Sequence, residues 1–193
     1  TMEDSPELGI GFDPDGAKAE LDAYLKEKGI GIAELPPITL MMNQVEGHIK
    51  IGEAIQAMWK DVLGVDVQLT TQEWKVYLET LDEDAPQIWR LGWCKDFPDA
   101  TNFVRDVFRS DSGNNRTKWA SADYDKMVDD AAAETDVVKR LEMYRAIEQM
   151  LVKDEAVIIP IYWYTSVLVS KPDLVRTYSV SGGIQVYEKF DRK

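Results

Sequence analysis

The chain has 193 residues, of which 45% are hydrophobic and 30% are charged, and its formal net charge is -13. A chain of this length and composition can bury roughly 70% of the surface that its unfolded form exposes, as soluble globular proteins do. The excess of acidic residues argues against binding to nucleic acids or to anionic membrane surfaces, because both need clusters of basic side chains.

No apolar stretch approaches the roughly 20 residues that a transmembrane helix needs. No signal peptide opens the chain, since residues 1–8 are polar and acidic. We therefore expect either a cytoplasmic protein or one whose targeting segment was removed or lies outside this chain. Cys94 is the single cysteine, which excludes an internal disulfide and a thiolate zinc cluster.

The first predicted helix begins after Asp13, because an N-cap residue followed by Pro14 is a typical helix start. Gly29 is expected to end this helix. Apolar residues at Ile38 to Asn43 then predict a short buried strand.

Apolar residues recur at helical spacing from Ile51 to Leu63, and Gly64 is expected to end that helix. Residues 65–69 alternate between apolar and polar side chains, which predicts a half-buried strand.

Thr70 and Glu73 have the spacing of a capping box ahead of a short helix that runs to about Leu81. Another strand is predicted from Ile88 to Trp93. The segment from Cys94 to Trp119 is polar and rich in Asp, Asn and Gly, and compact domains rarely keep loops of this length without a function.

Ser121 is expected to cap a helix that ends at Ala133, and Thr135 or Asp136 to cap the next one. The second of these helices has an apolar face, made of Val137, Leu141, Tyr144, Ile147 and Leu151.

An apolar run from Val157 to Tyr164 predicts a further strand, and a less regular tail follows, with strand-like pieces such as Gln185 to Tyr187. Alternating helices and strands indicate an α/β fold with a mixed sheet flanked by helices. We place a weak boundary near Ser170-Lys171-Pro172, which gives a domain of residues 1–170 and a tail of residues 171–193.

Several kinds of catalytic and metal site are absent or weakly supported. His48 is the only histidine, so paired-histidine metal sites are excluded and a Ser-His triad is disfavoured; we expect it to be a surface or capping group. Asp96 and Asp99 could serve a two-carboxylate hydrolase or merely shape turns around Pro98. Residues 115–117 match a glycosylation sequon, a triplet that often arises by chance.

The segment from Arg90 to Asp99 is the most informative part of the sequence. If it is extended, Arg90, Gly92, Cys94 and Asp96 share one face, and Trp93 lies on the other face, where core packing is its expected role. Arg90 could then bind a carboxylate and Asp96 an ammonium group, at the two ends of a zwitterion of tripeptide size, about 10 Å long. The alternative is that both charges serve structural ion pairs or turn caps.

The order and spacing of several motifs resemble the oligopeptide and dipeptide solute-binding proteins that supply ABC importers. In chain order these motifs are Phe12-Asp13-Pro14, Ala57–Val65, Gly92–Asp99 with Asn102-Phe103, Arg140–Glu148 and Ile159-Pro160. The resemblance covers roughly residues 11 to 165 and matches only the C-terminal part of such a protein. It implies the C-terminal lobe of a type II periplasmic-binding-protein clamshell, with the N-terminal lobe missing.

The resemblance also implies roles for individual residues. It implies that Asp96 pairs with the free amino group of a peptide and that Arg90 meets the peptide carboxylate. Trp93 and Phe97 could line the cleft, although core packing is the better interpretation of Trp93, and Asn102 is a candidate for the ligand site as well. The remaining signature residue, Cys94, is a further ligand-site candidate and stands where some relatives have a disulfide cysteine, whose partner would lie outside this chain.

We therefore predict a non-catalytic part of a binding protein, without cofactor or metal, that captures oligopeptides and delivers them to the membrane permease of an ABC importer. The resemblance implies an extracellular or periplasmic lipoprotein, anchored through a missing N-terminal signal. The alternatives are an oligosaccharide-binding (cellobiose-type) member of the same family, a two-carboxylate hydrolase, and a stand-alone lobe that acts only as an interaction module.

Overall fold

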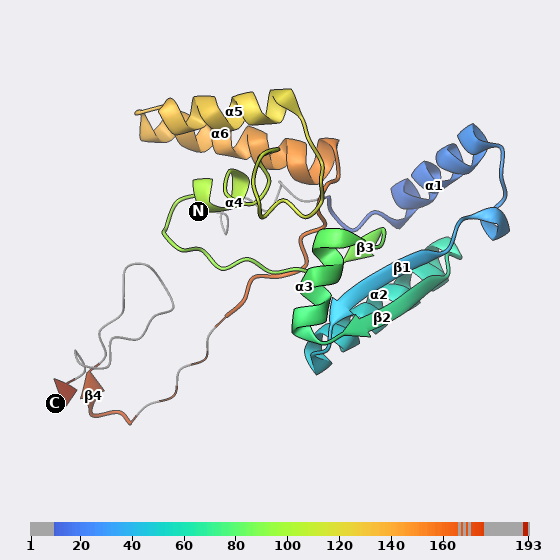
Figure 1. Cartoon of the computed structure of the whole chain (residues 1–193), viewed down its shortest axis with the longest axis horizontal. Coiled ribbons are helices and arrows are strands. Elements are labelled where there is room, and N and C mark those ends of the chain that lie inside the picture. The colour runs from blue at the N-terminus through green and yellow to red at the C-terminus, as the bar shows by residue number, and fades with distance from the viewer. Residues whose placement is uncertain (1–9, 166, 168, 170, 176–190, 193) are drawn as a thin grey trace. The chain divides into compact units, whose positions relative to one another are not determined.

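The computed structural model describes residues 10–165, 167, 169, 171–175 and 191–192. Its internal contacts divide the chain into two compact units. The first unit is Ile10–Gly92, and the second begins at Trp93. Each unit has its own hydrophobic core, so the two are described separately (Figure 1).

The first unit is built on a parallel sheet with the strand order β2-β1-β3. The central strand β1 (Ile38–Asn43) pairs along its whole length with β2 (Val67–Gln72) and over two residues with β3 (Ile88–Trp89). Parallel neighbours need a crossover connection, and helix α2 (Glu46–Leu63) provides it between β1 and β2.

Helices cover the two faces of this sheet because side chains alternate along β1. Leu40 and Met42 belong to the apolar cluster that includes α2, whereas Met41 packs with residues of α3 (Trp74–Glu83) (Figure 1). A Cβ atom at Gly52 of α2 would lie 2.3 Å from Cε of Met42, so the missing side chain lets the helix approach the sheet closely. The predicted α/β class is thus confirmed.

The predicted ends of the first two helices are also confirmed. Helix α1 is Pro14–Lys28, and the Asp13 side chain accepts a hydrogen bond of 2.9 Å from the Gly16 amide at its start. Gly29 and Gly64 follow α1 and α2 with φ of 66° and 71°, a left-handed conformation that glycine adopts without steric cost.

Two predictions around α3 are wrong. Thr70 lies inside β2, and Glu73 is itself the N-cap, whose carboxylate accepts a 2.9 Å hydrogen bond from the Lys75 amide. The third strand ends at Trp89 and not at Trp93, because β1 offers it only two pairing positions. The following residues leave the sheet and enter the second unit.

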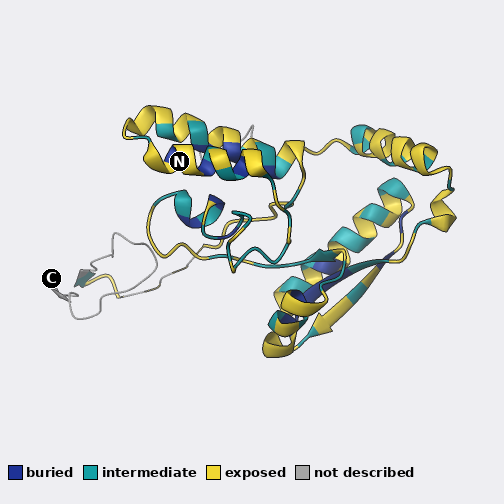
Figure 2. Cartoon of the chain, turned by 45° about the horizontal axis from the view of Figure 1, so that its top comes forward, coloured by how far each residue is buried: buried dark blue, intermediate teal, exposed yellow. Residues whose placement is uncertain are grey.

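The second unit packs a short helix against a helical pair. It contains α4 (Thr101–Val104), α5 (Ala122–Ala133), α6 (Val137–Gln149) and a π-helical turn, Met150–Asp154. Helices α5 and α6 lie side by side, with buried positions between them (Figure 2). The buried core consists of Val104, Tyr124, Val128, Ala131, Tyr144, Ile147 and Leu151.

Both predicted caps of the helical pair are present. The Ser121 hydroxyl accepts a 3.2 Å hydrogen bond from the Tyr124 amide at the start of α5. The Asp136 carboxylate accepts from the amides of Val138, at 2.9 Å, and Lys139, at 3.0 Å. Asp136 is therefore the cap of α6, and the alternative at the preceding threonine is not used.

The apolar face predicted for α6 is wider than the face that is buried. Tyr144 and Ile147 are buried, but Val137 and Leu141 are 60% and 50% exposed. The first two turns of the helix thus extend beyond the core formed with α5.

The strand predicted from Val157 to Tyr164 is not formed, because none of the described strands pairs with this segment and its backbone has no ladder to join. Further along, β4 (Leu174–Val175) pairs with β5 (Asp191–Arg192) in an antiparallel bridge. The strand-like piece at 185–187 lies outside the described residues, and the boundary predicted near residue 170 stays a prediction.

Helix α1 has no buried residue, and Figure 2 shows it exposed along most of its length. Its Leu21 nevertheless joins the apolar cluster that contains α2. None of the described helices combines the length and the apolar character that crossing a bilayer would require.

Candidate functional site

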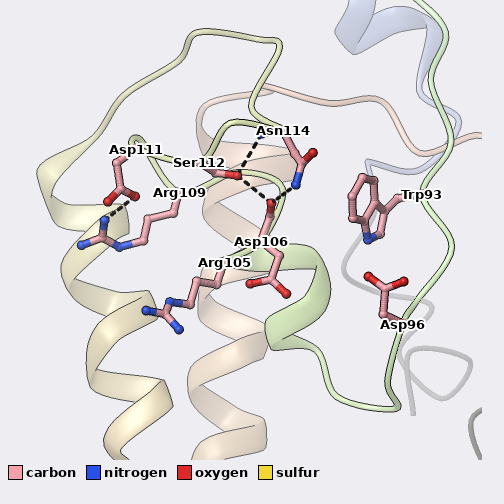
Figure 3. A pocket seen from close by; sticks show the side chains of 8 residues that line it. All are labelled: Trp93, Asp96, Arg105, Asp106, Arg109, Asp111, Ser112 and Asn114. Atoms are coloured by element: carbon pink, nitrogen blue, oxygen red, sulfur yellow. Dashed lines mark hydrogen bonds and ion pairs between the residues drawn. The ribbon is translucent and has the colours of Figure 1, made fainter.

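The second unit contains a hollow of about 420 Å³ in the segment around α4. Most of its lining side chains are charged or polar, and they come from the stretch that leads into α4 and from the turns that follow it (Figure 3). The lining residues are Trp93, Asp96, Arg105, Asp106, Arg109, Asp111, Ser112 and Asn114.

A buried amide, Asn102 of α4, organises one side of this hollow. The residue is 1% exposed, and its Oδ1 accepts hydrogen bonds from the Asp96 amide, at 2.8 Å, and from Nε1 of Trp93, at 3.3 Å. Its Nδ2 donates to the carboxylates of Asp96, at 3.3 Å, and Asp106, at 3.0 Å. Two donors face Oδ1 and two acceptors face Nδ2, so the amide has one sensible orientation and its bonding capacity is filled.

The Asp96 carboxylate is open to solvent at the hollow. Its one side-chain hydrogen bond is the 3.3 Å contact with Asn102, and no Lys, Arg or His of the described chain pairs with it. An exposed carboxylate that is oriented by its neighbours but has no counter-ion is suited to receive a cationic group from a ligand.

Asp99 has a different role, which argues against a pair of catalytic carboxylates. It accepts hydrogen bonds from the Thr101 amide, at 2.9 Å, and the Tyr144 hydroxyl, at 3.1 Å, and it lies 3.5 Å from the Arg140 guanidinium. Burial tends to raise the pKa of Asp99, but the hydrogen bonds and the Arg140 charge together lower it below its usual value. Asp99 is thus an ionised carboxylate that joins the α4 turn to α6, and not a proton donor beside Asp96.

The two arginines of the hollow differ in their bonding. Arg109 holds Asp129 with two parallel hydrogen bonds, of 3.2 and 3.0 Å, and also contacts Asp111. The hydrogen bonds to Asp129 and then Asp111 raise the pKa of the guanidinium and lower those of both carboxyl groups. The Arg105 side chain, in contrast, makes no hydrogen bond or ion pair within the described chain, although its charge helps to lower the pKa of Asp129.

Arg90 belongs to the first unit, where it lies just past the end of β3. Its guanidinium donates a 3.4 Å hydrogen bond to Oδ1 of Asn43, which also bonds Nδ1 of His48 at 2.8 Å. Its carbonyl accepts a short hydrogen bond from the Tyr77 hydroxyl, which fixes the backbone at this point. Burial, and then the Arg90 charge, lower the pKa of His48, so the histidine is neutral near pH 7. This polar group lies at the carboxyl ends of parallel strands, where open α/β sheets commonly bind ligands.

The structure brings together three of the residues that the sequence singles out, namely Trp93, Asp96 and Asn102. Trp93 was expected on the opposite face from Asp96, and this is wrong: both line the same hollow, because the chain is no longer a strand there. Cys94, a free thiol, and Phe97 are exposed and are not among the lining residues.

Two residues of these sites were not predicted from the sequence. Asp106 lies in the long loop outside every motif, although its position four residues after Asn102 was a signal that the two side chains could meet across a helical turn. His48 was expected to be a surface or capping group, and it is instead half-buried and bonded to Asn43. The described residues contain no cluster of three or more His, Cys, Asp or Glu arranged to hold a metal ion.

The sequon at Asn115 has a structural use. The Asn115 amide donates to three backbone carbonyls, among them that of Trp119 at 2.9 Å, and its Oδ1 accepts a 2.6 Å hydrogen bond from the Thr117 hydroxyl. A side chain engaged in this way holds the loop together.

Comparison with known proteins gives a consistent picture. A family model described as bacterial extracellular solute-binding proteins, family 5 Middle, matches residues 2–115. The oligopeptide-binding protein OppA of Bacillus subtilis is 41% identical over 160 residues, which cover 82% of this chain and 29% of that protein.

Two solved structures show the same fold. The Escherichia coli murein tripeptide binding protein MppA matches with a TM-score of 0.72 and 32% identity over 88% of this chain and 35% of its own. The complex of Haemophilus influenzae OppA with RPPGFSPFR matches with a TM-score of 0.72 and 32% identity over 82% of this chain and 31% of its own. The chain thus spans about a third of the length of each solved protein, and it has the fold of the corresponding part of these binding proteins.

Proposed function

Because the chain belongs to the bacterial extracellular solute-binding proteins of family 5, we propose that it is part of a protein that captures oligopeptides for an ABC importer. Asp96 binds the free amino group of the peptide. Residues 1–170 form one ligand-binding lobe, and residues 171–193 return toward a second lobe that lies outside this chain.

The observation that supports this proposal most directly is the state of the Asp96 carboxylate. It faces the hollow without a counter-ion, while the buried Asn102 amide holds both its main chain and one of its carboxylate oxygens. The orientation is therefore set before a ligand arrives, so little ordering entropy is lost on binding. A hydrogen bond between ionised groups contributes about 1.5–3 kcal/mol when formed in such a site.

We propose Arg90 as the contact for the peptide carboxylate. Its backbone is fixed by Tyr77, and its guanidinium donates a hydrogen bond to Oδ1 of Asn43 at the carboxyl end of β1. Because His48 is neutral near pH 7, Arg90 supplies the positive charge of this polar group. A guanidinium can bind a carboxylate through two parallel hydrogen bonds.

The protein would release its ligand to the membrane permease of an ABC importer, from an extracellular or periplasmic position. A lipoprotein anchor preceding this chain would hold it at the membrane. The names of the relatives support the peptide ligand and the periplasmic location.

One observation supports a second candidate ligand. The Trp93 ring lines the hollow beside Asp96 (Figure 3), and an aromatic face next to an acceptor carboxylate also suits a sugar ring with its hydroxyl groups. An oligosaccharide is therefore the alternative against which the peptide must be tested.

Isothermal titration calorimetry on the full-length protein separates the two. The ligands are a panel of free tripeptides, the same panel with acetylated amino groups, and a series of cello-oligosaccharides. We expect binding of the free peptides alone, and a loss of about 10- to 100-fold in affinity in Asp96→Asn, because the variant keeps the shape of the side chain but removes its charge.

Glu142→Gln is the matched control, since Glu142 is an exposed acid of α6 outside the hollow. This variant should bind as the wild type does. Binding of cello-oligosaccharides, or peptide affinity that ignores both acetylation and Asp96, would contradict the peptide assignment and favour the sugar.

A further inference from the structure

A second carboxylate shares the hollow with Asp96. Asp96 and Asp106 each direct an oxygen, Oδ2, at the same Nδ2 atom of Asn102, over 3.3 and 3.0 Å. The two oxygens therefore lie within about 6 Å of each other, and the Asn102 amide shows that a single N–H donor group can donate to both carboxylates. Figure 3 shows both carboxylates at the hollow, beside the Trp93 ring.

The position of Asp106 is fixed from its own backbone as well as through Asn102. Its carbonyl accepts hydrogen bonds from the Ser112 hydroxyl, at 2.6 Å, and from Nδ2 of Asn114, at 3.0 Å. Because the main chain and one carboxylate oxygen are both held, the remaining oxygen has a defined place in the hollow.

The cations of the hollow leave this pair of carboxylates uncompensated. Arg109 is occupied by Asp111 and Asp129, so its charge is already balanced. The Arg105 side chain extends away from Asp96 in Figure 3, on the same side of the hollow as the Arg109 side chain, and it makes no ion pair with Asp106 in the described chain. Within the described chain, neither Asp96 nor Asp106 has a cationic partner.

We propose that Asp106 is a second anchor for the ligand's amino group, so that one ammonium donates to Asp96 and Asp106 together and Asn102 acts as the positioning residue that sets their spacing. This inference rests on the proposed function, since it assigns a further residue to the same amine site. A site of this kind selects for a group that has both a positive charge and at least two N–H donors. A primary ammonium has three N–H bonds, an N-methyl ammonium has two, and an N,N-dimethyl ammonium has one.

The test is calorimetry on the full-length protein with its best-bound tripeptide in four forms: unmodified, N-methylated, N,N-dimethylated and N-acetylated. In the wild type, the step from one methyl group to two should lower affinity more than the step from none to one, because only the second step removes a donor that the two carboxylates need. This measurement requires no variant and therefore does not depend on how a substitution folds.

Asp106→Asn gives the complementary result. The asparagine keeps an oxygen that can accept from Asn102, so the network stays complete while the charge is lost. We expect about a fivefold loss of affinity for the unmodified peptide and less than about a twofold loss for the dimethylated one. Glu142→Gln should change neither value.

These experiments can contradict the role of Asp106 without contradicting the proposed peptide binding. If Asp106→Asn lost the same affinity for the unmodified and the dimethylated peptide, or lost none, the proposal that Asp106 shares the ammonium with Asp96 would be wrong. A strong loss of affinity in Asp96→Asn would still support the peptide assignment. Equal affinity of the wild-type protein for free and N-acetylated peptides would contradict both the amine site at Asp96 and the second anchor at Asp106.

Discussion

Glu148 lies on α6 with one carboxylate oxygen buried and without a hydrogen-bond partner in the described chain. Burial raises the pKa of Glu148 above its ordinary value of 4.5, and the neighbouring Arg145 charge offsets only part of this. The folded protein therefore holds this proton more tightly than the unfolded chain does. Stability from this group is greatest below the unfolded pKa and falls as the pH rises above it.

Glu148→Gln should accordingly stabilise the protein near pH 8 by about 1 kcal/mol and change little near pH 4, where the carboxyl group is already protonated. The measurement is urea unfolding followed by far-UV circular dichroism at both pH values. Glu142→Gln, an exposed position on the same helix, should show no such pH-dependent gain. A gain of equal size at both pH values would mean that packing, and not ionisation, distinguishes the variant.

Motif residues of the site can be predicted from the sequence, whereas the contacts between them depend on the backbone. The sequence singles out Asp96 as a candidate anchor because an acidic residue in a motif can be recognised without knowing the backbone, and the structure places it exposed at the hollow. The prediction that Trp93 lies on the face opposite Asp96 was wrong. Side chains alternate between two faces only while the chain stays extended as a strand, and the strand has ended before Trp93. Asp106 was missed because its place beside Asp96 depends on a bond to Asn102, a contact that the sequence suggests only by spacing.

At the scale of elements, the start of α6 offers a direct choice between two neighbouring residues. Asp136→Ala removes the acceptor of two amide hydrogen bonds and should lower the free energy of unfolding by about 1 kcal/mol. Thr135→Ala should cost much less, because the Thr135 side chain caps nothing in the structure. Chemical denaturation of the two variants beside the wild type measures this; comparable losses would show that Asp136 is not the effective cap.

The elements predicted well are those whose signals are local. Asp13, Gly29 and Gly64 bound their helices because capping and the left-handed conformation depend on a few consecutive residues. The strand predicted at residues 157–164 failed for the opposite reason. An apolar run forms a strand only beside a neighbouring strand, and the described chain provides none there.

At the scale of the whole chain, each unit has a core made of its own residues. The first unit has apolar clusters on the two faces of the parallel sheet, around Met42 and around Met41. The core of the second unit is formed by α4, α5, α6 and the π-helical turn, and its Tyr124 is completely buried. Units whose cores share no residue can unfold separately, so a destabilising substitution in one unit should lower the local stability of that unit alone.

Hydrogen–deuterium exchange of the full-length protein tests this independence with one substitution in each unit. Gly64→Ala places a side chain at a φ of 71° and should cost about 1 kcal/mol, so it should speed exchange in α2 and β1. Asp136→Ala should instead speed exchange in α5 and α6 and leave α2 unchanged. If either variant accelerated exchange in both units to the same degree, the chain would unfold as one cooperative body, because only global opening exposes all of these amides together.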